Sequence, residues 1–291
     1  MNRTATAPRL LACALLALPW LPAAHAATLA RISSPGQVLT VELESQHEGR
    51  LAYRVLHHDQ VVVEHSRLGF LLDEGRIERG VRFIDASSRS FDETWEQPWG
   101  ERRLTRNHYN ELRARLDWKA PGNAPGRRFD VVVRAYDDGI GLRYEFPEQD
   151  NRAPVRIRAE LTEFKLAGNP TAWWIPAFEW NREEYLYRRT PLDQIGIAQT
   201  PLTLRTGSGL HIALHEAALV DYAGMNLARG DGDVLRAALT PSSDGPAVVR
   251  TLPFHTPWRT IQVGARAGDL VESSLILNLN EPNAIGDVSW F

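Results

Sequence analysis

Residues 129–146 read FDVVVRAYDDGIGLRYEF, and this stretch decides the fold class. Apolar and polar residues alternate on both sides of a central Asp137-Asp138-Gly139, as expected for two half-buried strands joined by a tight turn. Asp-Gly is favoured in such turns because it tolerates the positive φ that two-residue hairpin loops need. The stretch therefore predicts an antiparallel β-hairpin.

Similar short alternating segments occur on both sides of this hairpin, and Pro or Gly separates most of them. Strands and helices do not alternate regularly, which disfavours a parallel α/β fold. The sequence therefore predicts an all-β protein, a large antiparallel β-sandwich with no internal domain boundary. A turn or two of helix is expected only at residues 110–116 and 192–198. The other predicted strands include residues 39–43, 155–161, 201–205, 210–214, 247–252, 260–263 and 270–279.

The first 26 residues have the organisation of a signal peptide. Arg3 and Arg9 precede an apolar run, and Ala24-His25-Ala26 fits a small-residue cleavage site. The apolar run is shorter than the ~20 residues that span a bilayer. We therefore expect residues 1–26 to be removed and the mature chain, residues 27–291, to be periplasmic or secreted.

The composition excludes several classes of protein. The chain has 33 basic and 36 acidic residues and a formal net charge of −3, so it lacks the basic surplus typical of nucleic-acid binding. Its one cysteine, Cys13, lies in the predicted signal peptide. The mature chain is therefore expected to fold without a disulfide, although it is exported to a compartment that permits them.

Tryptophans are concentrated in two places. Trp95 and Trp99 form one pair, and Trp173, Trp174 and Trp180 form a second group. Aromatic faces stack on the C–H faces of sugars, so Trp173, Trp174, Trp95 and Trp99 are candidate substrate-binding residues. Tryptophan also packs well in sandwich cores, where its N–H finds a partner. Composition alone leaves both interpretations open.

The carboxylates and histidines do not define a catalytic site. Glycoside hydrolysis needs two carboxyl groups ~5–10 Å apart, and no spacing rule in this sequence selects such a pair. Glu216 has the parity of Leu214 on a strand, which predicts that it faces inward or lies at the strand end. His211 and His215 are too far apart on a strand to bind one metal ion. Other acidic residues near aromatic or apolar sequence are Glu183, Glu184, Glu272 and Glu281.

Nine stretches, in order along the mature chain, resemble the N-terminal domain of glycoside hydrolase family 97, a family of bacterial α-glycosidases with retaining and inverting members. Each stretch is weak by itself, and their shared order makes the resemblance specific. They are residues 66–69 (SRLG), 99–101 (WGE), 107–112 (NHYNEL), 137–145 (DDGIGLRYE), 184–187 (EYLY), 200–203 (TPLT), 215–219 (HEAAL), 253–260 (PFHTPWRT) and 277–282 (LNLNEP).

The resemblance implies a β-super-sandwich of the galactose-mutarotase-like type. In the family this domain packs against a following catalytic (β/α)₈ barrel, which supplies the catalytic acid and the base or nucleophile. This chain reaches Phe291 about where the barrel would begin, so no catalytic residue is expected in it. Both a truncated product and a stand-alone sandwich from a split or degenerate gene fit that expectation.

The resemblance also implies a calcium ion in the family's active site. Most of its ligands are barrel glutamates, and one glutamate comes from the N-terminal domain. We assign that role to Glu184, with Glu216 as the second candidate. Calcium takes six to eight oxygen ligands, so one glutamate can complete such a site but not form it. The alternative for Glu184 is a surface ion pair with Arg188 or Arg189.

Three functions follow as hypotheses. The first is the substrate-flanking part of a secreted, calcium-dependent α-glycosidase acting on oligosaccharides, with its barrel in the same or a split protein. The second is a stand-alone periplasmic carbohydrate-binding module. The third is an aldose-epimerase-like enzyme in which a His/Glu pair moves the anomeric proton. Adjacent strand residues such as His215 and Glu216 point to opposite faces, which counts against the third hypothesis.

Overall fold

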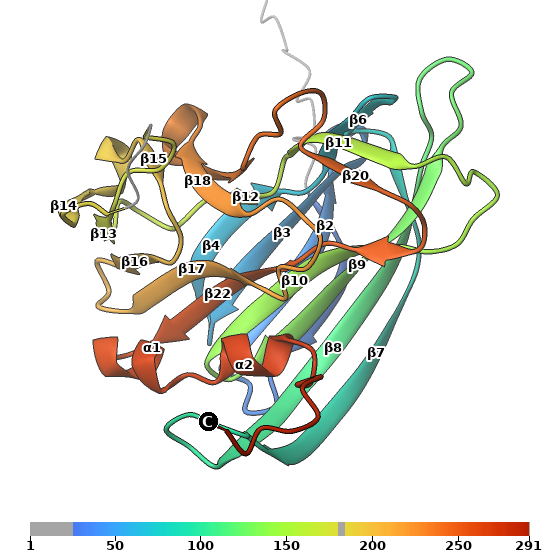
Figure 1. Ribbon diagram of the computed structural model, residues 1–291. Helices are drawn as coiled ribbons and strands as arrows, with labels where there is room; N and C mark the ends of the chain where they lie inside the picture. The colour runs from blue at the N-terminus through green and yellow to red at the C-terminus, as the bar shows by residue number, and fades with distance from the viewer. Residues whose placement is uncertain (1–25, 180–183, 291) are drawn as a thin grey trace, which may run out of the picture.

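The computed structural model describes residues 26–179 and 184–290 of the chain. Every strand pairing in these ranges is antiparallel, so the predicted all-β antiparallel sandwich is confirmed (Figure 1). The predicted signal peptide lies almost entirely outside the described residues, as do Trp180 and Glu183. Across the described part of the chain, no helix is both long enough and apolar enough to cross a membrane.

The largest sheet has ten strands within the described ranges, and its two ends are far apart in Figure 1. In spatial order its strands are β14 (Arg188–Pro191), β13 (Thr171–Trp174), β16 (Leu202–Arg205), β17 (His211–Ala217), β22 (Trp258–Gly264), β10 (Gly139–Phe146), β9 (Arg127–Tyr136), β8 (Leu104–Trp118) and β7 (Val81–Glu96), with β21 (Phe254–His255) paired to β10.

Three four-stranded sheets accompany it in the described residues. The first contains β1 (Ala27–Ser33), β2 (Leu39–Gln46), β3 (Arg50–His57) and β4 (Gln60–Arg67). The second contains β20 (Val248–Arg250), β11 (Val155–Glu160), β5 (Phe70–Leu72) and β6 (Gly75–Ile77). The third contains β12 (Glu163–Phe164), β19 (Leu235–Leu239), β18 (Met225–Arg229) and β15 (Ile197–Ala198). The helical elements are η1 (His47–Gly49), η2 (Leu192–Gln194), η3 (Asp231–Asp233), α1 (Ala267–Glu272) and α2 (Leu275–Leu279).

The main core lies between the β1–β4 sheet and the ten-stranded sheet. Alternate residues of β2 and β9 enter this core, for example Leu39, Val41, Val131 and Val133, and all four are fully buried. Burying one such side chain stabilises the fold by about 1.5–3 kcal/mol relative to leaving it exposed. We call the core-facing side of the ten-stranded sheet its inner face and the opposite side its outer face.

The predicted hairpin is present, but its glycine has a different role from the one expected. Tyr136 pairs with Gly139, so Asp137 and Asp138 form the turn, and Gly139 has no positive φ. A Cβ at Gly139 would lie 2.7 Å from a methyl carbon of Leu275 on α2 and 2.8 Å from the carbonyl oxygen of Ile261 on β22. The glycine is therefore required for close packing and not for the turn.

Two secondary-structure predictions are wrong. The segment 270–279, predicted as a strand, contains the end of α1 and all of α2. Leu275 and Leu279 are four residues apart, so on a helix they share one side, and there they pack against the outer face. Residues 110–116, predicted as a helical turn, lie in β8, because their alternate residues Leu112 and Leu116 fill the main core. The predicted turn at Leu192 is confirmed as η2.

Candidate functional site

A buried ionic cluster joins three strands near the centre of the molecule. Arg259 of β22 donates two hydrogen bonds to Glu160 of β11, from Nε to Oε1 at 2.9 Å and from Nη2 to Oε2 at 2.6 Å. Its Nη1 donates to Oε2 of Glu216 on β17 at 2.6 Å. The other oxygen of Glu216 accepts the backbone N–H of Met225 at 2.9 Å. Both oxygens of Glu216 are therefore occupied within the fold.

Hydroxyl groups extend the Glu160–Arg259–Glu216 cluster. Thr162 donates to Oε1 of Glu160 at 2.8 Å, and its oxygen lies 2.8 Å from the hydroxyl of Tyr144 on β10. The Tyr144 oxygen accepts the backbone N–H of Gly69 at 3.1 Å. Because every buried member has a polar partner, the cluster avoids the penalty of an unsatisfied buried charge. Its role is to connect the sheets.

The pKa values reflect an imbalance of charge in this cluster. Burial raises the pKa of Glu216, and the attraction of Arg259 does not outweigh it. Burial alone would lower the pKa of Arg259, but the charge of Glu160 and the hydrogen bonds to it raise that pKa overall. One guanidinium serves two carboxylates, so its attraction only partly offsets the cost of burying the charge of Glu216.

Glu184, the first calcium candidate, lies in a very different environment. It is exposed, in the loop that leads to β14. The predicted alternative, an ion pair with Arg188 or Arg189, is absent from the described residues. Arg188 lies 5.1 Å from the ring of Trp174 and Arg189 lies 5.4 Å from that of Trp173, so both guanidinium groups stack on tryptophans instead.

The four candidate tryptophans do not form one site. Trp173 and Trp174 lie on β13, next to one edge of the ten-stranded sheet, whereas Trp95 lies on β7 at the other edge. Trp174 is 4% exposed and donates its indole N–H to Thr190, so it is mainly a packing residue. Trp95 donates to Asn278 of α2 and is half-buried, and Trp99 is 43% exposed in the β7–β8 loop. Their assignment to substrate binding stays a prediction.

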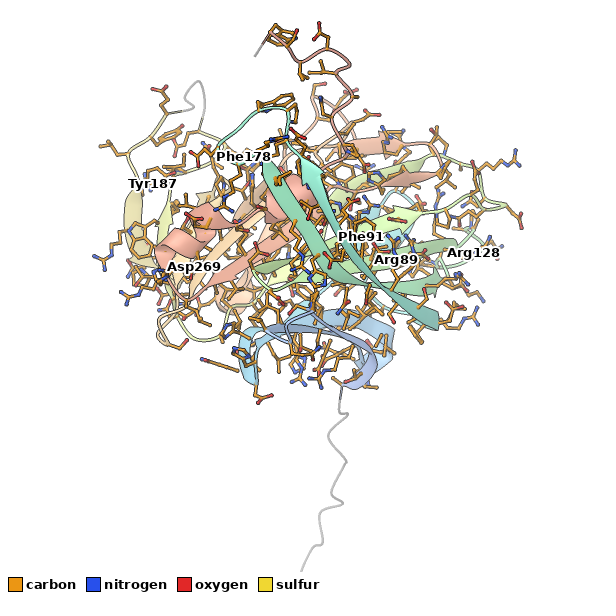
Figure 2. The ribbon with its side chains drawn as sticks, turned by 90° about the horizontal axis from the view of Figure 1, so that it is seen from below. Arg89, Phe91, Arg128, Phe178, Tyr187 and Asp269 are labelled. Carbon is orange, nitrogen blue, oxygen red and sulfur yellow. The ribbon has the colours of Figure 1, made fainter. Side chains whose placement is uncertain are left out.

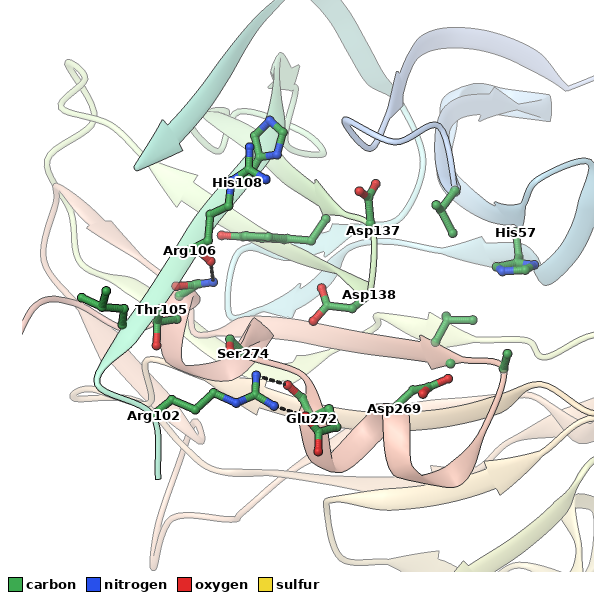
Figure 3. A pocket seen from close by; sticks show the side chains of 17 residues that line it. His57, Arg102, Thr105, Arg106, His108, Asp137, Asp138, Asp269, Glu272 and Ser274 are labelled. Carbon is green, nitrogen blue, oxygen red and sulfur yellow. Dashed lines mark hydrogen bonds and ion pairs between the residues drawn. The ribbon is translucent and has the colours of Figure 1, made fainter. Parts of the chain in front are cut away.

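A cleft of about 600 Å³ lies at the end of the β9–β10 hairpin (Figure 3). Several polar side chains that line it are already paired. Arg102 forms an ion pair with Glu272, and Asp138 accepts a hydrogen bond from the hydroxyl of Ser273 at 2.6 Å. Asn278 donates to the carbonyl of Arg106 at 2.9 Å. The predicted site residues do not line this cleft. Its carboxylates are held by the fold and form no obvious acid/base pair.

The histidines and acidic residues do not form a metal centre in the described part of the chain. His211 and His215 lie on strand β17, as expected, and burial lowers the pKa of His215. The described ranges contain no group of three or more His, Cys, Asp or Glu residues arranged to hold a metal ion. The exposed Glu184 can offer one carboxylate, but these residues do not fit a complete calcium site.

The inward orientation of Glu216 was predicted from its strand parity, but its partners were missed. Arg259 and Glu160 lie 43 and 56 residues from it in the sequence. The pairing of β17 with β22 brings Arg259 to Glu216, and the side chain of Arg259 reaches Glu160 on β11 in a different sheet. The one available signal was Arg259 within an apolar strand, because a buried arginine requires acidic partners. His215 and Glu216 point to opposite faces, as the sequence predicted, which disfavours the epimerase hypothesis.

Comparison with known proteins defines the class to which this fold and sequence belong. The model of the glycosyl-hydrolase 97 N-terminal domain matches residues 32–282. The chain therefore belongs to glycoside hydrolase family 97, and the resemblance inferred from the sequence is confirmed. Within it, the chain is similar to a retaining α-galactosidase of Bacteroides thetaiotaomicron, with 26% identity over 281 residues. A probable retaining α-galactosidase of Streptomyces bingchenggensis is also 26% identical, over 257 residues.

A solved structure agrees closely with the fold. The family 97 enzyme of Pseudoalteromonas sp. strain K8, solved in complexes with panose and with acarbose, is 40% identical with a TM-score of 0.85. The alignment covers 90% of this chain and 39% of that enzyme. The alignments with the two α-galactosidases each cover 83% of this chain. They cover 40% of the Bacteroides protein and 36% of the Streptomyces protein. The chain thus spans about two-fifths of the relatives that it matches.

Proposed function

We propose that this chain is the non-catalytic N-terminal part of a secreted, calcium-dependent α-glycosidase, and that it flanks the active site of a catalytic barrel. The observation that carries the proposal is the match to the family's N-terminal domain over 251 residues, together with a span of only two-fifths of the related enzymes. Oligosaccharides with α-glycosidic linkages are the expected substrates, since panose and acarbose are bound by the Pseudoalteromonas enzyme.

The arrangement of the acidic residues supports a non-catalytic role. Two carboxyl groups must act on one glycosidic bond, one as a proton donor and the other as a base or nucleophile. Glu160 and Glu216 are bound to Arg259 inside the fold. In the cleft, Glu272 is bound to Arg102 and Asp138 to Ser273. Acids used in this way are structural and are not free to protonate a leaving group.

Glu184 is the calcium ligand that this chain would supply. Its exposure allows it to face a neighbouring domain, and calcium prefers carboxylate oxygens of this kind. Glu184 would supply one ligand, and the barrel would supply the others. Glu216 is the weaker candidate, because both of its oxygens accept hydrogen bonds from Arg259 and Met225. Trp173, a half-buried candidate tryptophan of β13, pairs with Arg189 of β14, the strand that follows the Glu184 loop.

A chimaera tests the proposal. Residues 27–291 replace the N-terminal domain of the Pseudoalteromonas enzyme, whose fold they match closely. We expect the chimaera to hydrolyse panose and p-nitrophenyl α-glucoside, and residues 27–291 alone to hydrolyse neither. Turnover by residues 27–291 alone would contradict the non-catalytic role. Tight binding of panose by the isolated chain, combined with an inactive chimaera, would instead favour the stand-alone carbohydrate-binding module.

A further inference from the structure

Strand β7 forms one edge of the ten-stranded sheet and is unusually open. It has 16 residues, none of which is buried, and β8 is its only partner among the strands of residues 26–179 and 184–290. Residues 84–90 are all exposed, so neither face of the strand is covered there. An edge strand carries a row of backbone N–H and C=O groups that can pair with another strand. Figure 2 shows Arg89 and Phe91 on the hairpin that β7 forms with β8, well away from Tyr187 near the opposite edge of the sheet.

The strand is regular over residues 85–96, after a bulge at Ile84. Its odd-numbered side chains lie on the outer face. Arg89 binds Glu111 there at 2.8 Å, and Phe91 stacks on Tyr109 with ring centroids 5.2 Å apart. Glu93 follows on the same face by alternation, opposite Asn107 of β8. Glu93 makes no ion pair with any of the described residues, so its charge is available to a partner outside that part of the chain.

This outer row is self-complementary. When β7 is paired antiparallel with a second copy about a two-fold axis through Phe91, Arg89 of each copy lies opposite Glu93 of the other. The two Phe91 rings meet at the centre, and Ser87 lies opposite Trp95. On the inner face Ser90 lies opposite Asp92, and Ser88 opposite Thr94. No like charges are opposed over the eleven residues 86–96.

Two other two-fold registers centred on residues of the outer face are worse. Centring the axis on Arg89 places that arginine opposite itself and Asp85 opposite Glu93, which are both repulsive. Centring it on Ser87 aligns Asp85 with Arg89, but the bulge at Ile84 limits regular pairing to five residues, 85–89. From the charges that face each other in these registers we infer that the free edge of β7 pairs with β7 of a second copy of this chain, centred on Phe91. The inference does not depend on the proposed function.

Charge reversal tests this pairing. In a dimer of Glu93→Arg, each arginine introduced at position 93 faces Arg89 of the other copy. In a dimer of Arg89→Glu, each glutamate introduced at position 89 faces Glu93 of the other copy. Sedimentation velocity of residues 27–291 over a concentration series should show a dimer, with self-association about tenfold weaker or worse in either variant. An equimolar mixture of the two variants should regain the dimer, because the heterodimer restores an Arg–Glu pair at both positions.

Two controls separate this pairing from a general loss of stability. Arg115→Glu opposes two like charges across β7 and β8, since Arg115 binds Asp85, but it lies one strand away from the free edge. That variant should dimerise like the wild type. Amide hydrogen exchange should show protection within residues 86–96 that rises with protein concentration. A monomeric wild type, a dimer indifferent to both charge reversals, or two monomeric variants whose mixture stays monomeric would each overturn the inference.

Discussion

The two glutamates considered for calcium lie in opposite physical environments. Glu216 is 8% exposed, and both of its oxygens are used by Arg259 and the backbone of Met225. Glu184 is exposed on a loop between strands. A buried carboxylate is retained where its partners are inside the same fold, whereas a carboxylate that serves a neighbouring domain must be accessible. The comparison separates a glutamate that holds the sandwich together from one available to something outside it.

The largest effect is expected from the residue that both buried acids share. Arg259→Met should destabilise the fold by about 3–5 kcal/mol, because it leaves Glu160 and Glu216 buried without a counter-charge. Urea unfolding followed by tryptophan fluorescence measures the loss. The matched control is Arg266→Met, which removes an arginine–aspartate pair at the exposed start of α1 and should leave stability almost unchanged, because solvent screens that pair. Equal effects of the two changes would contradict the structural role of the cluster.

Glu216→Gln should cost less, about 1–2 kcal/mol, because glutamine keeps an oxygen for the N–H of Met225. Its cost should also depend on pH. Burial raises the pKa of Glu216 above the ordinary value of 4.5, so its stabilising contribution is complete below 4.5 and declines as pH rises through the folded pKa. The loss of stability in Glu216→Gln, relative to the wild type, should therefore be smaller at pH 7 than at pH 4. Unfolding free energies at these two pH values provide the measurement.

Glu163 provides a comparison for this prediction. It is buried like Glu216, but its pKa is shifted in the opposite direction. Burial alone would raise the pKa of Glu163, but hydrogen bonds from Arg67 and Arg236 lower it overall. Its contribution is therefore present above 4.5 and is lost as pH falls through the folded pKa. Glu163→Gln should cost more at pH 7 than at pH 3. If the cost of both substitutions changed with pH in the same direction, the number of arginine partners would not decide the direction of the pKa shift.

The smallest effect on stability is expected at Glu184. Glu184→Gln should change the free energy of unfolding by less than about 0.5 kcal/mol, as is usual for substitutions at exposed positions. Thermal unfolding of residues 27–291 is sufficient to check it. A loss of several kcal/mol would show that Glu184 has a role within the sandwich, and the contrast with Glu216 would then fail.

The sequence was informative wherever local pattern was enough. Alternation in residues 129–146 predicted the β9–β10 hairpin, and strand parity predicted that Glu216 points inward. Leu270–Leu279 was misassigned because leucines four residues apart can occupy either a strand or a short helix. What decides is the space that Gly139 and Gly141 leave for α2. The partners of Glu216 could not be predicted, since they depend on which strands become neighbours.

The same limit applies to the predicted sugar-binding tryptophans. Both tryptophan clusters are candidates for substrate binding, and the sequence does not show that strand order places β13 and β7 near opposite edges of the ten-stranded sheet. The self-complementary row on β7 shows the converse case. Arg89, Phe91 and Glu93 have no recognisable motif, and their spacing becomes meaningful only once β7 is known to be an edge strand with a free side.

The most direct test of the central claim is calcium affinity in the chimaera that joins residues 27–291 to the Pseudoalteromonas barrel. Calcium is titrated into the chelator-treated protein by isothermal calorimetry, with panose hydrolysis measured in parallel. Glu179, exposed in the same β13–β14 connection, provides the matched control. We predict that Glu184→Gln weakens calcium binding by at least about tenfold and lowers activity with it, while Glu179→Gln and Glu216→Gln leave calcium affinity unchanged. Unchanged affinity in Glu184→Gln, with affinity lost in Glu216→Gln, would contradict this account.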